Sequence, residues 1–117
     1  MEYPTPMQCV NMSKRIPVVR EDALLPGSRL HFELEEESAI LLNVDGKYYC
    51  IADLCTHDGG PLEDGDVLDC QIECPRHGAR FDIRTGKVTR LPATDPIPVY
   101  PVVIEDGIIY IEAPDPW

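Results

Sequence analysis

Two cysteines and two histidines stand in two short segments of the sequence, and their spacing suits metal ligation. Cys55 and His57 lie in "CTHDGG", and Cys74 and His77 lie in "CPRHGARFD". The pattern is C-x-H, 16 intervening residues and C-x-x-H, so each segment supplies one thiol and one imidazole. Thiolates and imidazoles are ligands of zinc and of some two-iron clusters. The four residues therefore predict one metal centre held by two segments of the chain.

Two kinds of metal centre fit four such ligands: a single tetrahedral zinc ion, or a two-iron cluster with two ligands on each iron. Zinc sites usually group like ligands, as in C-x2-4-C followed by H-x3-5-H, whereas each segment here mixes a cysteine with a histidine. Mixed segments let both cysteines reach one iron and both histidines the other. The spacing favours the cluster, and a structural zinc-binding module remains as an alternative.

The two segments read as loops on a β scaffold. Apolar and polar residues alternate along much of the chain, and no stretch of ten or more residues shows helical spacing, which predicts an all-β fold. Gly59, Gly60 and Pro61 follow the first pair, and Pro75 and Gly78 lie within the second segment. Glycine lets a backbone approach a ligand closely. We therefore expect a rigid sheet that presents two loops to the metal.

The predicted strands are short and joined by recognisable turns. In the run 38–44, Ile40, Leu42 and Val44 would share one face. Asp-Gly pairs at 45–46 and 106–107 predict hairpin turns. Pro98 and Pro101 remove backbone donors, so their strand should be irregular or at a sheet edge. The predicted strands are 29–34, 38–44, 47–52, 67–74, 79–83, 87–92, 99–105 and 108–112.

The cysteines and the histidine outside the motif are interpreted without a metal. Five cysteines are an odd number, so they cannot all be paired, and in a reducing compartment their spacings indicate metal ligation more readily than a disulfide framework. Cys50 and Cys70 lie in strand patterns and are expected to be reduced packing residues. Cys9 lies near the N-terminus, and the sequence indicates no role for it. His31 alternates within a predicted strand and is expected to be a surface or core residue rather than a ligand.

Length and charge restrict the function classes. A chain of 117 residues is normally one domain, and its net charge of -11 argues against binding a nucleic acid backbone. No apolar run approaches the roughly 18 residues of a membrane span. The N-terminus has no basic start and no apolar segment of a secretory signal, so a cytoplasmic location is expected.

The charges are also unevenly distributed. The stretch 53–73 holds seven acidic residues and no lysine or arginine. Half of the basic residues follow within 15 positions: Arg76, Arg80, Arg84, Lys87 and Arg90. This asymmetry fits either a solubilising surface or a docking surface for soluble protein partners.

The motif, the "GG" after the first pair and the "HGARFD" and "TGKV" runs resemble the Rieske-type 2Fe-2S proteins, specifically the small soluble Rieske ferredoxins. The resemblance covers about 16–112. It implies one domain over 1–117 with three stacked antiparallel sheets, in which a cluster-binding subdomain of about 54–81 sits on a base of about 14–53 and 82–112. It also implies that Cys55 and Cys74 hold a buried iron and that His57 and His77 hold a solvent-facing one.

Departures from the quinol-oxidising branch of the family bear on the reduction potential. That branch has a cysteine at each position that corresponds to Gly60 and Arg76, joined as a disulfide, so no such link is expected here. It also has a serine and a tyrosine where this sequence has Ala79 and Phe81. Hydrogen bonds to cluster sulfurs stabilise the added electron, so their loss predicts a potential near the low end of the Rieske range, about -150 mV.

The resemblance implies a monomeric one-electron carrier rather than an enzyme. Apart from the two proposed ligands, the chain has only His31, which is too few histidines for a second, mononuclear iron held by two histidines and a carboxylate. The implied role is the ferredoxin of an aromatic-ring-hydroxylating dioxygenase, which takes electrons from a flavin-dependent reductase and passes them to a terminal Rieske oxygenase. The alternatives are the small Rieske-like subunit of an assimilatory nitrite reductase and the structural zinc module.

Overall fold

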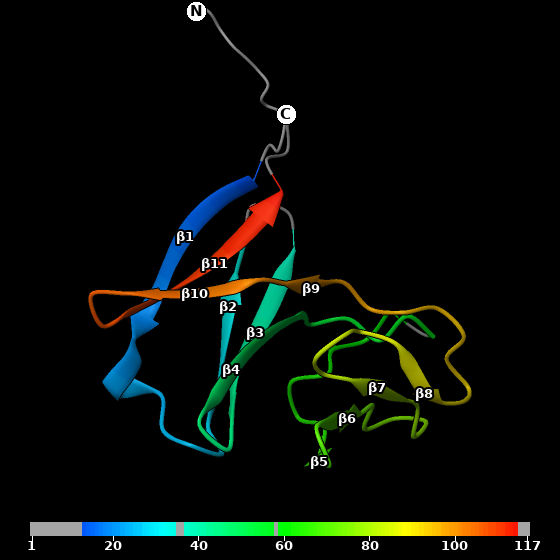
Figure 1. Cartoon of the computed structure of the whole chain (residues 1–117). Helices are drawn as coiled ribbons and strands as arrows, with labels where there is room; N and C mark the ends of the chain where they lie inside the picture. The colour runs from blue at the N-terminus through cyan, green and yellow to red at the C-terminus, as the bar shows by residue number, and fades with distance from the viewer. Residues whose placement is uncertain (1–12, 35–36, 58, 115–117) are drawn as a thin grey trace, which may run out of the picture.

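The computed structural model describes residues 13–34, 37–57 and 59–114, and almost all of its regular structure is β. The strands form three antiparallel sheets, which confirms the predicted fold class (Figure 1). One short 3-10 helix, η1 (Glu21–Ala23), follows the first strand. No described helix is long and apolar enough to span a membrane. Cys9 lies outside the described residues.

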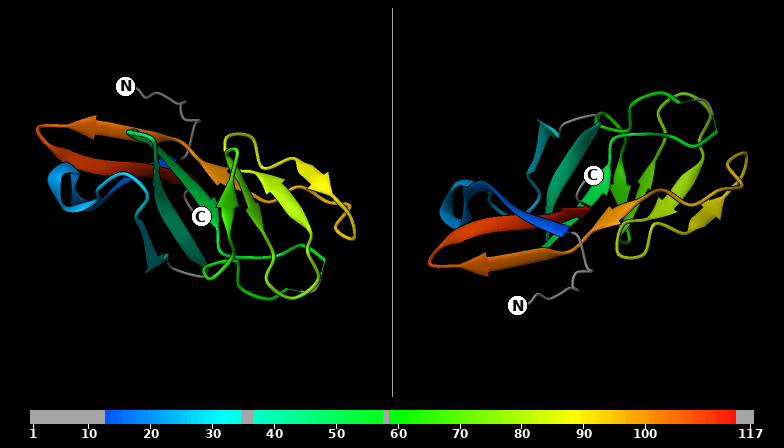
Figure 2. Two further views of the ribbon diagram at one scale, coloured as in Figure 1. Left: turned by 90° about the horizontal axis from the view of Figure 1, so that it is seen from below. Right: turned by 90° about the horizontal axis from the view of Figure 1, so that it is seen from above.

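The first sheet has the order β1-β11-β10 and forms one end of the molecule (Figure 2). Its strands are β1 (Ser13–Arg20), β10 (Val102–Glu105) and β11 (Ile108–Pro114). The sequence pattern does not predict β1, because Pro17 interrupts its alternation. In the structure the register against β11 shifts between Pro17 and Val19, and this irregularity accommodates the proline.

The second sheet lies in the middle and has the order β2-β3-β4-β9. Its strands are β2 (Arg29–Glu33), β3 (Ser38–Val44), β4 (Lys47–Ala52) and β9 (Val99–Tyr100). Pro101 separates β9 from β10, and the two short strands occupy the edges of different sheets. The prediction of a proline-bearing edge strand is thus confirmed, although one expected strand is two.

The middle sheet is buried on both faces. Ile40 and Leu42 pack toward the third sheet in a core with Phe81. Ala39 and Leu41, on the opposite face of β3, pack toward the first sheet. This arrangement explains why β3 is almost continuously buried, and it confirms that the three sheets are stacked.

The third sheet has the order β5-β6-β7-β8 and lies at the end of the molecule opposite the first sheet (Figure 2). Its strands are β5 (Val67–Leu68), β6 (Gln71–Glu73), β7 (Arg80–Asp82) and β8 (Val88–Arg90). The two cysteine-histidine segments adjoin this sheet, so it is the part of the fold that positions the candidate site.

The prediction of one strand over 67–74 is wrong. The chain reverses at Asp69 and Cys70, which have φ of 53° and 59°, and Leu68 pairs with Gln71. Positive φ at both central residues is the geometry of the tightest hairpin turns, which usually contain glycine. Because Asp-Cys is not a usual sequence for such a turn, the alternation of apolar residues conceals it. Cys70 therefore lies in a turn rather than in a strand, although it is half-buried and packs against the core that contains Phe81, as expected of a packing residue.

Candidate metal centre

The first loop is closed by backbone hydrogen bonds around Cys55. The amide of Cys55 donates to the carbonyl of Gly60 at 2.7 Å, and the amide of Gly59 donates to the carbonyl of Cys55 at 2.7 Å. Gly59 has a φ of 76°, in the left-handed region where a side chain would be strained. The loop therefore needs glycine at the fourth position after its cysteine.

The second loop repeats the same hydrogen-bond pattern around Cys74. Its amide donates to the carbonyl of Ala79 at 2.7 Å, and the amide of Gly78 donates back to the carbonyl of Cys74 at 3.1 Å. Gly78 has a φ of 79°, close to that of its counterpart in the first loop. The common C-x-x-x-G spacing is the sequence signal for this shared geometry, which the ligand spacing alone does not reveal.

The candidate ligands form two pairs in these loops, one of cysteines and one of histidines. Cys55 and Cys74 are 0% and 1% exposed and belong to the same apolar core as Phe81. His57 and His77 are exposed, and their ring centroids are 5.2 Å apart with an interplanar angle of 61°. The site thus pairs two buried sulfur donors with two adjacent imidazoles at the surface. Such a donor set fits a two-iron cluster with unlike ligands on its two irons.

A carboxylate on the base supports the first loop. Asp53 directly follows β4, and its Oδ1 accepts hydrogen bonds from the amides of Leu62 at 2.6 Å and Glu63 at 3.0 Å. Its Oδ2 lies 3.2 Å from Nε2 of His31 on β2. Arg29, also on β2, donates to the carbonyls of Glu63 at 2.6 Å and Gly65 at 2.7 Å. We call the contacts of Asp53 and Arg29 with residues 62–65, together with the contact of His31 with Asp53, the base latch.

Sequence reasoning gave the base latch no role. One potential ligand atom each of His31, Asp53 and Glu63 lies within 4.8 Å of the others, which is close enough for a metal. However, the two amides on Oδ1 and the nearby imidazole already account for the burial of the Asp53 side chain, which is 4% exposed. The half-buried His31 thus has Asp53 as a partner within the protein, and its lack of a metal role stays a prediction. The position of Asp53 two residues before Cys55 is the only signal in the sequence.

The predicted basic run is partly neutralised by neighbouring acids. Arg80 contacts Glu73 at 2.9 Å across β6 and β7, and Arg84 contacts Asp82 at 3.0 Å. The hydrogen bond from Arg84 lowers the pKa of the Asp82 carboxyl. These arginines do not form an isolated positive field, so the structure weakens the argument for a docking surface made of the whole run.

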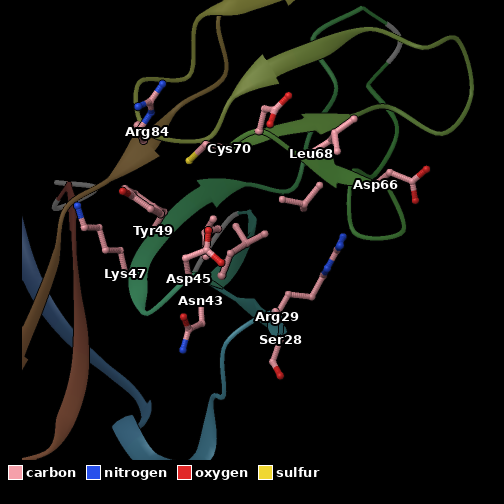
Figure 3. Close-up of a pocket in the computed structure, with 15 residues that line it drawn as sticks. Ser28, Arg29, Asn43, Asp45, Lys47, Tyr49, Asp66, Leu68, Cys70 and Arg84 are labelled. Atoms are coloured by element: carbon pink, nitrogen blue, oxygen red, sulfur yellow. The ribbon is translucent and has the colours of Figure 1, made fainter.

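The remaining described cysteines are free thiols away from the loop tips. Cys50 is 2% exposed in the core between the first and second sheets, where burial raises its pKa to about 12. Cys70 lines an open groove of about 960 Å³ between the β3–β4 turn and the third sheet (Figure 3). The groove also contains charges of both signs, including Arg29, Lys47 and Asp45. None of the four candidate ligands lines it.

Comparisons with known proteins agree with this geometry. A family model described as the Rieske [2Fe-2S] domain matches residues 14–101. The chain belongs to this family, and its cofactor is a 2Fe-2S cluster. Within the family it is a ferredoxin, an electron carrier rather than an enzyme.

The similar proteins include dioxygenase ferredoxins. The ferredoxin subunit of 3-phenylpropionate/cinnamic acid dioxygenase from Escherichia coli K12 is 45% identical over 76 residues, 64% of this chain and 72% of that protein. The ferredoxin of carbazole 1,9a-dioxygenase from Nocardioides aromaticivorans IC177 is 34% identical, with a TM-score of 0.77 over 86% of this chain and 99% of that one.

Two further solved structures of similar chains concern the kinds of protein with which such a chain assembles. A chain in a complex of reduced oxygenase and oxidised ferredoxin of carbazole 1,9a-dioxygenase is 26% identical, with a TM-score of 0.80 over 88% of this chain and 96% of that one. A chain described as a putative NADH-dependent nitrite reductase small subunit from Mycobacterium tuberculosis has a TM-score of 0.77 over 88% of this chain and 97% of that one. At 20% identity it shows the shared fold alone.

Proposed function

We propose that Cys55 and Cys74 bind one iron of the cluster and that His57 and His77 bind the other. The observation that carries this assignment is the division between two buried thiols and two exposed imidazoles 5.2 Å apart. Two neutral imidazoles in place of two thiolates make the cluster less negative, which raises its potential relative to an all-cysteine ferredoxin. When bound, the cluster accepts and releases one electron at a time.

The exposed imidazole edges of His57 and His77 form the electron exit in this proposal. Pro61 and Pro75 are exposed on the same two loops and provide a small apolar rim for docking. A rim of this kind suits a brief encounter, because a small contact area permits rapid release of the partner. A carrier of single electrons needs such turnover.

The partner we propose is the terminal oxygenase of a multicomponent, ring-hydroxylating dioxygenase. Support comes from the similar proteins, which are named as dioxygenase ferredoxins, and from the similar chain in an oxygenase–ferredoxin complex. The electron donor would be a flavin-dependent reductase, and the carrier would act as a monomer in the cytoplasm. The nitrite reductase alternative has weaker support, because that similarity extends only to the fold.

The domain organisation is also a proposal. We divide the single domain into a base and a cluster-binding part that begins at about Leu54. Because β8 pairs with β7, we place the end of the cluster-binding part at about Arg90 rather than at the predicted Phe81. The remaining strands belong to the base.

We further propose a reduction potential near the low end of the Rieske range, about -150 mV. Ala79 and Phe81 are both 0% exposed beside the second loop, and neither has a hydroxyl to donate to a cluster sulfur. A strongly positive midpoint in a redox titration would contradict this.

The first test is metal analysis with visible and low-temperature EPR spectra of the purified protein, before and after reduction by dithionite. The proposal expects about two irons per chain and a Rieske-type signal only in the reduced form. A colourless protein that retains zinc after anaerobic iron-sulfur reconstitution would instead establish the structural zinc module. Electron delivery is tested separately, by mixing the reduced protein with a purified terminal oxygenase and following reoxidation.

A further inference from the structure

The side chain of Arg76 crosses from the second loop to the first. A Cβ atom built on Gly60 would overlap Cζ and Nη2 of Arg76. The guanidinium of Arg76 therefore occupies the space that a side chain at Gly60 would fill. Gly60 itself is buried, whereas Arg76 is an exposed residue, so the guanidinium covers the backbone of the first loop from outside.

The backbone of Gly60 does not explain why glycine stands there. Gly59 and Gly78 have positive φ, which favours glycine, but Gly60 is not among the glycines with positive φ. An alanine would be free of backbone strain at this position. The space taken by Arg76 is thus the local reason for a residue without a side chain.

The two loops need contacts between them if they are to hold one cofactor. Each loop closes on its own cysteine with its own backbone hydrogen bonds, as described above. Such bonds fix the shape of each loop but do not set the distance between them. The packing of Arg76 on Gly60 joins the loops directly, next to the pair of imidazoles.

We propose that Arg76 is a positioning residue for the cluster. Its guanidinium packs on the backbone of Gly60 and holds the second loop against the first, so that His57 and His77 keep their separation. A guanidinium is planar and presents its donors in a rigid fork, whereas the ammonium of lysine is a compact point charge, so lysine does not reproduce this contact. The inference rests on the proposed ligand assignment.

A second consequence follows from charge. Reduction adds one negative charge to the cluster, and a guanidinium fixed near the ligand loops stabilises that charge. Removing Arg76 should therefore lower the reduction potential as well as loosen the loops. Moving the guanidinium away without removing it should lower the potential less, because the charge remains on the protein.

The test compares Arg76→Ala, Arg76→Lys, Gly60→Ala and the double variant Gly60→Ala/Arg76→Ala with the holoprotein. Arg90→Ala is the matched control, since Arg90 is an exposed arginine on β8 and its loss changes the net charge equally. The readouts are the rate at which the visible absorbance decays in excess chelator and the midpoint potential. Gly60→Ala should still fold, because the atoms it displaces are the far end of a flexible side chain.

We expect Arg76→Ala and Gly60→Ala each to release the cluster several-fold faster than wild type, with Arg90→Ala unchanged. The double variant should be no faster than Arg76→Ala, because both substitutions break the same contact. Compared with Arg76→Ala, Arg76→Lys should regain most of the wild-type reduction potential, but it should still release the cluster faster than wild type.

Two results would overturn the proposal: decay rates and potentials of Arg76→Ala equal to those of Arg90→Ala, or effects of Gly60→Ala and Arg76→Ala that simply multiply in the double variant. A wild-type protein without a Rieske signal would be a different failure, because it would refute the ligand assignment on which the inference rests.

Discussion

The two ends of the molecule are built differently. In the proposed base, β1 has 8 residues, β3 has 7 and β11 has 7, and the ladders that pair β1 with β11 and β3 with β4 are long. In the cluster-binding part, β5 has 2 residues, and β6, β7 and β8 have 3 each. Short ladders supply few hydrogen bonds, so this part depends more on side-chain packing and on its cofactor.

The middle sheet connects these two parts through its opposite faces. Leu41 faces the core of the base, and Leu42, the next residue, faces the core that contains Cys55 and Cys74. The same strand thus packs against the core of the proposed base on one face and against the core of the proposed cluster-binding part on the other. From this comparison we expect that the cluster can be lost while most of the fold remains.

The largest expected difference between the two parts follows from the removal of a proposed histidine ligand. We expect His77→Ala to abolish the Rieske visible and EPR signals, because one iron would lose a proposed imidazole ligand. Far-UV circular dichroism should still report a β-rich protein, because the base has its own core. A His77→Ala protein that keeps the wild-type spectrum would refute the assignment, and His31→Ala serves as the control that should retain it.

The next prediction separates the two faces of β3. Leu41→Ala and Leu42→Ala remove the same atoms from adjacent, buried positions, 0% and 2% exposed, and each should lower the free energy of unfolding by about 2–5 kcal/mol. Only Leu42→Ala should also speed the loss of the cluster in chelator. Chemical denaturation and the decay of the visible absorbance measure the two effects. Equal decay rates in both variants would contradict the proposed division of roles between the faces.

These two regions also differ in how far the sequence predicts them. The hairpin from β3 to β4 is predictable because the Asp45-Gly46 turn and the alternation of apolar residues agree. The candidate ligands are predictable because metal chemistry restricts both residue type and spacing. By contrast, the turn at Asp69 and Cys70 is not predictable, because cysteine stands where such a turn usually has glycine and does not signal the positive φ that it adopts.

The base latch and the contact of Arg76 with Gly60 cannot be predicted from the sequence, for a different reason. Each joins segments that are distant in sequence, and no local pattern records which side chain will reach which backbone. His31 looks like any polar residue of an alternating strand, and only the packing of β2 beside residues 62–65 places it near Asp53. Long-range contacts between a side chain and a backbone need the folded structure.

A smaller effect is expected when the base latch between the two regions is broken. Asp53→Ala leaves the amides of Leu62 and Glu63 without their acceptor and should cost about 1–3 kcal/mol in the free energy of unfolding. Asp53→Asn keeps a side-chain oxygen for these amides and should cost less. Denaturation of the two variants measures the difference. If both variants unfold like wild type, the base latch does not couple the two parts.

The smallest predicted effect concerns thiol reactivity. It tests whether the core of the base, which contains Cys50, stays inaccessible to a reagent in solution. Burial raises the pKa of Cys50 from 9.0 to about 12, so this thiol stays protonated in the folded protein at pH 9.5, whereas it ionises in the unfolded chain. Its contribution to stability is therefore lost as the pH rises from about 9 toward 12.

In the native holoprotein at pH 8.5, iodoacetamide should modify the half-buried Cys70 before Cys50, and denaturant should remove the difference. Mass spectrometry of peptides identifies the labelled sites. Rapid labelling of Cys50 in the native protein would show that the base opens readily, and the contrast between a stable base and a cofactor-dependent end would then have to be abandoned.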